Sequence, residues 1–168
     1  MLPTLKQQSL ALQEGRDTSS GLTQAALARD RAGHGGFARD VEQILDRDGQ
    51  AVDGRARDAG AVIVGRTNMT EFAYSGLGLN PHYGTPRNPW DRATGRIPGG
   101  SSSGAAVSVT DGMASGAIGS DTGGSVRIPA ALCGLAGFKP SAQRVSMQGV
   151  LPLSANLDSI GPLAPSVR

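Results

Sequence analysis

Glycine is the residue that most constrains how this chain folds. The sequence contains 25 glycines, and sixteen of them fall between Gly60 and Gly137. They follow no collagen-like period and alternate with aliphatic residues, which argues against both a triple helix and a disordered segment. Glycines set among Ser, Thr and Asp are typical of tight turns and of backbone that approaches another group closely. The sequence therefore predicts a globular core with glycine-rich loops.

Composition and charge exclude several classes of protein. Only 4% of the residues are aromatic, so Ala, Val, Leu and Ile must form the core. A net charge of +2 gives no electrostatic footprint for nucleic acid or acidic lipid. No apolar run approaches the roughly 20 residues of a membrane span, and no secretion signal is expected.

The cysteines and histidines exclude the common metal motifs. Cys133 is the only cysteine, so we expect no disulfide framework and a reducing, cytoplasmic setting. His34 and His82 are too far apart in the sequence for a usual His-based metal motif. We therefore expect neither a metal nor another cofactor.

Hydrophobic patterning predicts an α/β protein, in which helices flank a mixed β-sheet. Helical spacing and capping predict helices at Thr18–Arg29 and Phe37–Arg47, with a short helix resuming to Asp58. The apolar run Ala61–Val64 predicts a buried strand directly after Gly60. Beyond the loop-rich stretch from 76 to 100, the expected elements are a buried helix at Ser103–Ser115, a strand at Ala117–Ser120, a helix at Ile128–Cys133 and a strand at Leu135–Lys139.

Two loops concentrate the polar chemistry, Pro98–Gly104 and Asp121–Arg127. Each places hydroxyls beside glycines, where backbone N–H groups can converge on a phosphate or an oxyanion. For either loop alone, a tight turn whose serines satisfy local backbone groups is the simpler interpretation.

Spacing removes several specific alternatives for these loops. A P-loop requires Lys after its last glycine, but Ala105 follows Gly104. Ser102 lies at the centre of a Gly-x-Ser-x-Gly pattern, yet the α/β-hydrolase order requires a later histidine, and both histidines precede it.

Taken together, the two loops and their neighbours resemble the amidase signature family in order and spacing. The matching segments are VIVGRTNMTEF (62–72), GTPRNPW (84–90), PGGSSSG (98–104) and GSDTGGSVRIPA (119–130), continued by residues 133–134, 137–140, 144–146 and 157–162. Motifs of this length in series are highly specific. The resemblance implies one domain, with an N-terminal helical segment at 1–58 and a partial signature core at 59–168.

The resemblance also assigns the chemistry to a serine, a second serine on a cis peptide and a lysine. It implies that Ser125 is the nucleophile and that Ser101 is the bridging serine, with the two hydroxyls in hydrogen-bond reach. The residues implied to form the oxyanion hole or to bind substrate are Thr122, Gly123, Gly124, Ser125, Gly99 and Gly100; those implied to support the site are Asp121, Arg127 and Ser102. Arg127 is expected to pair with Asp121 or Asp158.

The family's lysine is where this sequence departs from the pattern. That lysine lies in a Gly-x-Pro-x-x-x-Lys-Asp segment upstream of residue 65, and no such segment occurs here. The two lysines are Lys6 and Lys139, and neither matches the catalytic position. The stretch between Arg31 and Asp58 therefore resembles a junction from which a strand has been lost, so we expect an incomplete fold.

Three functions remain open on these residues. The first is an amidase that cleaves a small-molecule carboxylic amide to an acid and ammonia or an amine, impaired by the absent lysine. The second is a glutaminase-like subunit of an aminoacyl-tRNA amidotransferase, and the third is a shortened member without turnover. In each case we expect exposed apolar faces or edges at Ala61–Val64 and Ala117–Ser120, and hence a homo-oligomer or a partner chain.

Overall fold

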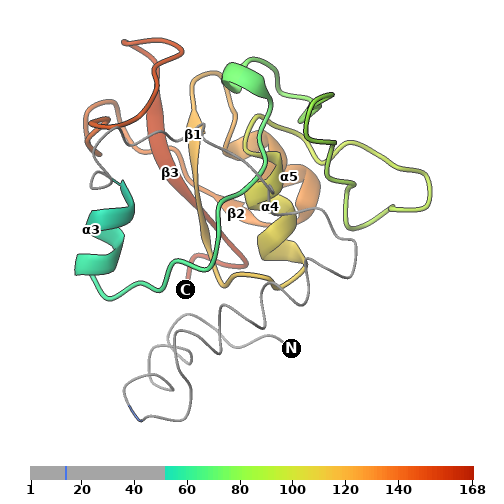
Figure 1. Cartoon of the computed structure of the whole chain (residues 1–168), viewed down its shortest axis with the longest axis horizontal. Helices are drawn as coiled ribbons and strands as arrows, with labels where there is room; N and C mark the ends of the chain where they lie inside the picture. The colour runs from blue at the N-terminus through green and yellow to red at the C-terminus, as the bar shows by residue number, and fades with distance from the viewer. Residues whose placement is uncertain (1–13, 15–51) are drawn as a thin grey trace.

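A three-stranded sheet lies at the centre of the fold (Figure 1). The computed structural model describes Glu14 and residues 52–168 of the chain. The strands are β1 (Ala117–Asp121), β2 (Ala136–Gly137) and β3 (Ser159–Ala164), in the spatial order β1-β3-β2. Both pairings are antiparallel, so the described part of the sheet shows no parallel pair where a mixed sheet was predicted.

Helices accompany the sheet, as expected for an α/β protein. Helices α4 (Ser103–Thr110) and α5 (Arg127–Cys133) pack together beside the strands, whereas α3 (Val52–Asp58) lies away from them (Figure 1). A short 3-10 turn, η2 (Glu71–Ala73), opens the long loop region that leads to α4. No helix in the described part of the chain is long and apolar enough to cross a membrane.

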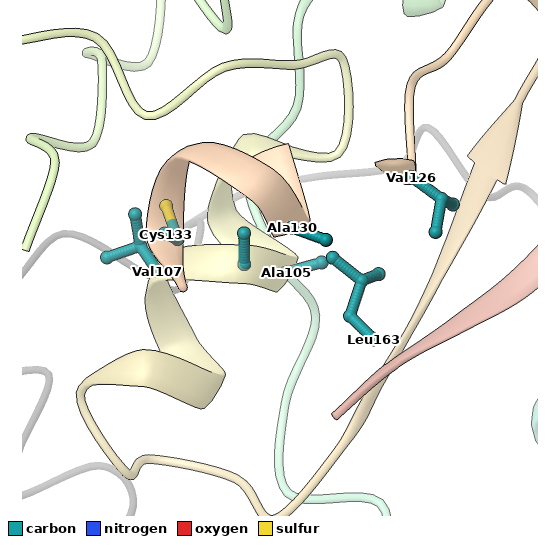
Figure 2. Packing of buried hydrophobic residues seen from close by; sticks show 7 residues of the cluster. Ala105, Val107, Val126, Ala130, Cys133 and Leu163 are labelled. Carbon is teal, nitrogen blue, oxygen red and sulfur yellow. The ribbon is translucent and has the colours of Figure 1, made fainter. Parts of the chain in front are cut away.

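Small aliphatic side chains fill the space between α4, α5 and the sheet (Figure 2). The core consists of Ala105, Ala106, Val107, Val126, Ala130, Cys133 and Leu163, all at most 1% exposed. Every residue of α4 from Ser103 to Val109 is buried. The helix consists largely of the small residues Gly, Ala and Ser, so neighbouring backbone can approach it closely. The prediction of an aliphatic core without large rings is confirmed.

Most of the predicted elements in the described region are present. The short helix before Asp58, the strand after Ala117 and the helix ending at Cys133 are confirmed. The predicted helix from Ser103 ends at Thr110 rather than Ser115, and the predicted strand at Leu135–Lys139 is reduced to two residues. The predicted helices at Thr18–Arg29 and Phe37–Arg47 lie outside the described residues.

The prediction of a strand at Ala61–Val64 is wrong. The segment forms no ladder, and Val62, Ile63 and Val64 are only half-buried. An apolar run becomes a strand only when another strand satisfies its backbone N–H and C=O groups. The described residues provide no such strand.

Sequence reasoning did not predict the central strand β3, because two of its residues disfavour a strand. It contains Gly161 and Pro162, which are both uncommon inside strands. Gly161 is required here, since a Cβ at this position would lie 2.0 Å from the carbonyl oxygen of Phe138. The backbone of Phe138 approaches so closely that position 161 requires glycine, although glycine is uncommon inside strands.

One face of the sheet carries a row of exposed apolar side chains that runs across the strands. Ile118 of β1 pairs in register with Pro162 of β3, and both are exposed. Phe138, whose N–H donates to the carbonyl of Pro162, is 63% exposed. The predicted exposure of apolar side chains at Ala117–Ser120 is thus confirmed for Ile118.

Candidate active site

The turn after β1 is organised by one buried carboxylate. Asp121 is fully buried and accepts hydrogen bonds from the backbone N–H groups of Gly124 (2.8 Å), Val126 (3.1 Å) and Arg127 (3.3 Å). The guanidinium of Arg127 completes the set, with Nε at 3.1 Å and Nη2 at 3.0 Å. These bonds fold residues 121–127 back on the end of β1 and fix Ser125 at the start of α5.

The ionised form of Asp121 is favoured by this arrangement. Burial opposes ionisation most strongly, but the hydrogen bonds from the Arg127 side chain and from the Val126 and Arg127 amides outweigh it. The pKa of Asp121 is therefore lowered, and the same pairing raises the pKa of Arg127. Of the two expected carboxylate partners of Arg127, the structure selects Asp121.

Asp158 braces the other side of the same turn. It accepts a hydrogen bond from the Thr122 hydroxyl and bonds from the N–H groups of Leu153 and Ser154, both at 2.9 Å. Thr122 is thereby tied to the loop that precedes β3. Two carboxylates therefore hold the turn at 121–127: Asp121, which lies inside it, and Asp158, which lies beside it.

The turn leaves a subset of its amides available to a ligand. Ser125 is 8% exposed, and Gly123 is exposed, with nothing within 4 Å of where its Cβ would be. The N–H of Gly124 is donated to Asp121 in this conformation, and its role in an oxyanion hole stays a prediction. Among the described residues, no hydrogen bond occupies the N–H groups of Thr122, Gly123 and Ser125.

The second loop lies directly against this turn. The N–H of Ser102 donates to the carbonyl of Ser125 at 3.2 Å, and the Ser102 hydroxyl donates to the carbonyl of Ser120 at 3.2 Å. Ser102 thus joins two segments about 20 residues apart in sequence, and its supporting role in a site stays a prediction. The peptide bond between Gly100 and Ser101 is cis, which confirms the expected non-proline cis peptide.

Glycines allow the second loop to approach its neighbours. The N–H of Gly100 donates to the carbonyl of Gly76 at 2.8 Å, and a Cβ on Gly100 would lie 2.5 Å from the nitrogen of Gly78. Gly99 has a φ of +79° and is packed against Pro129 and Leu132 of α5. Both glycines shape the loop, and their part in an oxyanion hole or in substrate binding stays a prediction.

The expected hydrogen bond between the hydroxyls of Ser101 and Ser125 is not formed. Ser101 is fully buried, and its Oγ has no hydrogen-bond partner. The two loops are joined instead through the backbone of Ser102, which leaves the Ser101 hydroxyl uncommitted.

No base reaches Ser101 from the described residues. Lys139 Nζ donates to the carbonyl of Pro140 at 2.8 Å and to the Ser159 hydroxyl at 3.4 Å. His82 lies 3.5 Å from Glu71, and both side chains are largely exposed. Lys6 lies outside the described residues. No group of three His, Cys, Asp or Glu side chains in the described part of the chain is arranged to hold a metal.

The buried thiol of Cys133 is not a competing nucleophile. Burial, reinforced by the carboxylate of Asp111, raises its pKa to about 12. The thiolate, which is the reactive form, is therefore scarce at neutral pH. The expectation of a small buried core residue is supported.

Sequence reasoning assigned no role to Thr70, which contacts the second loop. Its N–H donates to the carbonyl of Ser101 at 3.0 Å, and its buried hydroxyl has no hydrogen-bond partner. The segment around it was recognised only as part of a motif. The polar side chain of Thr70 did not mark it as a site residue, because a threonine hydroxyl in a loop normally finds local hydrogen-bond partners.

Comparisons with known proteins agree on one family. The family model described as Amidase matches residues 34–168. A glutamyl-tRNA(Gln) amidotransferase subunit of Syntrophobacter fumaroxidans is 48% identical over 131 residues, which cover 78% of this chain and 26% of the relative. The 2-amino-5-chloromuconic acid deaminase of Comamonas testosteroni is 50% identical over 107 residues, which cover 64% of this chain and 23% of the relative.

Solved structures share the fold. A crystal structure of an amidase superposes with a TM-score of 0.84 at 34% identity, over 99% of this chain and 49% of that one. The chain therefore spans about half of that protein and about a quarter of the curated relatives. The α/β class predicted from the sequence is confirmed. With the family model matching most of its length, the chain belongs to the amidase family.

Proposed function

We propose that this chain carries the nucleophile of an amide-hydrolysing site and that Ser125 is that nucleophile. The observation that carries the proposal is the turn at 121–127. It presents Ser125 beside three amides, those of Thr122, Gly123 and Ser125, that no described residue occupies. Backbone N–H groups held in this way stabilise the negative oxygen that develops when a carbonyl is attacked.

The proposed reaction runs through an acyl-enzyme. Ser125 Oγ forms a bond to the amide carbonyl carbon while its proton leaves, and the resulting oxyanion faces the free amides. The C–N bond then breaks, the nitrogen takes up a proton, and ammonia or an amine departs. Water attacks the ester, which regenerates Ser125 and releases the carboxylic acid.

We assign Ser101 the role of proton relay between Ser125 and a base. Its hydroxyl has no other partner, so no existing hydrogen bond opposes that role. The described residues supply no base, since Lys139 is held by Pro140 and Ser159. Loss of one member of an interdependent catalytic set costs roughly 10⁴–10⁶ in rate. We therefore expect slow turnover from the chain on its own.

A second candidate is a glutaminase that works with partner chains. The 48% identity to a glutamyl-tRNA(Gln) amidotransferase subunit favours it. Exposed Ile118 and Phe138, on one face of the sheet, provide an apolar surface for another chain. A member of the family without turnover is the alternative if both activities are absent.

Ammonia release tests the proposal. Purified chain is incubated with simple primary amides and, separately, with glutamine, beside the variants Ser125→Ala and Ser141→Ala. Ser141 is an exposed serine outside the two loops and serves as the matched control. We expect slow release that Ser125→Ala abolishes and Ser141→Ala retains. Release that survives Ser125→Ala overturns the assignment, and preference for glutamine selects the second candidate.

A further inference from the structure

One apolar side chain lies where the two loops of the site meet. Ile128 of α5 follows Ser125 by three residues, and its N–H donates to the carbonyl of Gly124 at 2.7 Å. A Cβ added at Gly124 would lie 2.8 Å from Ile128 Cδ1, and one added at Gly99 would lie 3.1 Å from Ile128 Cγ2. The side chain of Ile128 is therefore packed against the backbone of both loops.

Ile128 nevertheless keeps part of its surface open. It is 37% exposed, whereas Val126, the other large apolar residue between 121 and 128, is fully buried in the core. Gly76 lies against the same side chain, because a Cβ there would be 3.1 Å from Ile128 Cδ1. The exposed part of Ile128 is thus an apolar surface beside the turn at 121–127.

The position of Ile128 relative to the unoccupied amides decides what it would contact. The N–H groups of Gly123 and Ser125 belong to the residues on either side of Gly124, and Ile128 packs on Gly124. A carbonyl group that is held by those amides and attacked by Ser125 carries its acyl chain away from them, over the neighbouring surface. On the Gly124 side of the turn, Ile128 provides that surface.

The charged side chains of the turn are already bonded. Asp121 and Arg127 pair with each other, and Asp158 accepts hydrogen bonds from Thr122 and from two backbone amides. An ionic group placed beside Ile128 would lose water without gaining a counter-charge from these residues, which is unfavourable. An apolar group loses nothing there, and apolar side chains form most of the lining of small-molecule sites.

We propose that Ile128 determines specificity by contacting the acyl group of the substrate, and that the substrate is an amide with an apolar acyl chain rather than glutamine. This inference rests on the proposed function and names its substrate class. Each methylene that is buried against Ile128 should tighten binding by up to about fourfold. The ammonium and carboxylate groups of glutamine gain nothing from the same contact.

Binding of an amide series tests the proposal separately from turnover. Ligand-observed NMR titrations with acetamide, propionamide, butyramide and glutamine compare the wild type with Ile128→Val, Ile128→Thr and Ile118→Thr. Ile118 is the matched control, since it is an isoleucine of nearly equal exposure, 39%, on β1. We expect the wild type and Ile118→Thr to bind butyramide up to about tenfold more tightly than acetamide. Ile128→Thr should lose most of that difference, and Ile128→Val, which lacks only one methyl group, should lose part of it.

Three results would overturn the proposal. They are equal or no saturable binding of acetamide and butyramide by the wild type, tighter binding of glutamine than of butyramide, and an unchanged chain-length dependence in the Ile128 variants. Ile128→Val removes so little that it decides the question alone if Ile128→Thr does not fold.

The proposed function fails independently of this site. If Ser125 proves unreactive while the chain-length dependence remains, the nucleophile assignment is refuted and the apolar contact at Ile128 stands. If Ser125 reacts but acetamide and butyramide bind equally, only the role of Ile128 is refuted.

Discussion

Removing the hydroxyl of Thr70 should stabilise the chain, against the usual effect of a buried substitution. Thr70 Oγ1 is buried without a partner, and a hydroxyl in that state costs about 1–3 kcal/mol of folding free energy. Valine has nearly the same shape and removes only the polar atom. Thr70→Val should therefore raise the free energy of unfolding by about 1 kcal/mol or more.

Thr110 provides the matched comparison. Its hydroxyl donates to the carbonyl of Cys133 at 3.0 Å and ties the end of α4 to the end of α5. Thr110→Val breaks that bond and should lower the free energy of unfolding by about 1 kcal/mol. The two isosteric substitutions should thus differ by about 2 kcal/mol, with opposite signs.

Urea unfolding at equal protein concentration measures the difference. The midpoints should move in opposite directions while the slopes stay equal, since neither substitution changes the surface exposed on unfolding. A loss of stability in Thr70→Val equal to that in Thr110→Val would refute the reasoning, because it would mean that the Thr70 hydroxyl is paired in the folded protein.

Three further predictions concern the turn, the sheet and the exposed apolar face. The pKa of Asp121 is lowered in the folded protein, so its ionised form stabilises the fold above the ordinary aspartate pKa of about 3.9. This stabilisation is lost as the pH falls through the folded pKa. Urea midpoints measured between about pH 3 and 6 should decrease accordingly, and Asp121→Asn should reduce that decrease. Gly161→Ala should give insoluble or strongly destabilised protein, whereas Gly123→Ala, with open space at its Cβ, should melt like the wild type in calorimetry. In sedimentation velocity the chain should self-associate, and Ile118→Ser with Phe138→Ser should reduce that association; a monodisperse wild-type monomer at micromolar concentration contradicts it.

Local signals in the sequence were sufficient for the part of the fold that carries the site. The apolar residues after Ala117, the Gly-Gly turn and the small-residue helix from Ser103 each depend on neighbours in the chain, and all three are present. The Ala61–Val64 prediction failed because a strand also depends on a distant partner. The strand β3 forms although Gly161 and Pro162 are unfavourable in strands, because it pairs with the distant strand β1.

The arrangement of the site was only partly predictable. The pairing of Asp121 with Arg127 follows from their spacing around one turn, and the family resemblance supplied the cis peptide before Ser101. The unpaired hydroxyls of Thr70 and Ser101 could not be foreseen. They result from how two loops meet in space, and a hydroxyl without a partner leaves no pattern in a sequence.

The central claim, that Ser125 is the nucleophile, is tested most directly by locating a covalent adduct. The chain is treated with a fluorophosphonate, and the modified residue is identified by mass spectrometry. The account predicts a slow adduct on Ser125 that is absent from Ser125→Ala. An adduct on another serine, or no adduct on Ser125, would contradict it.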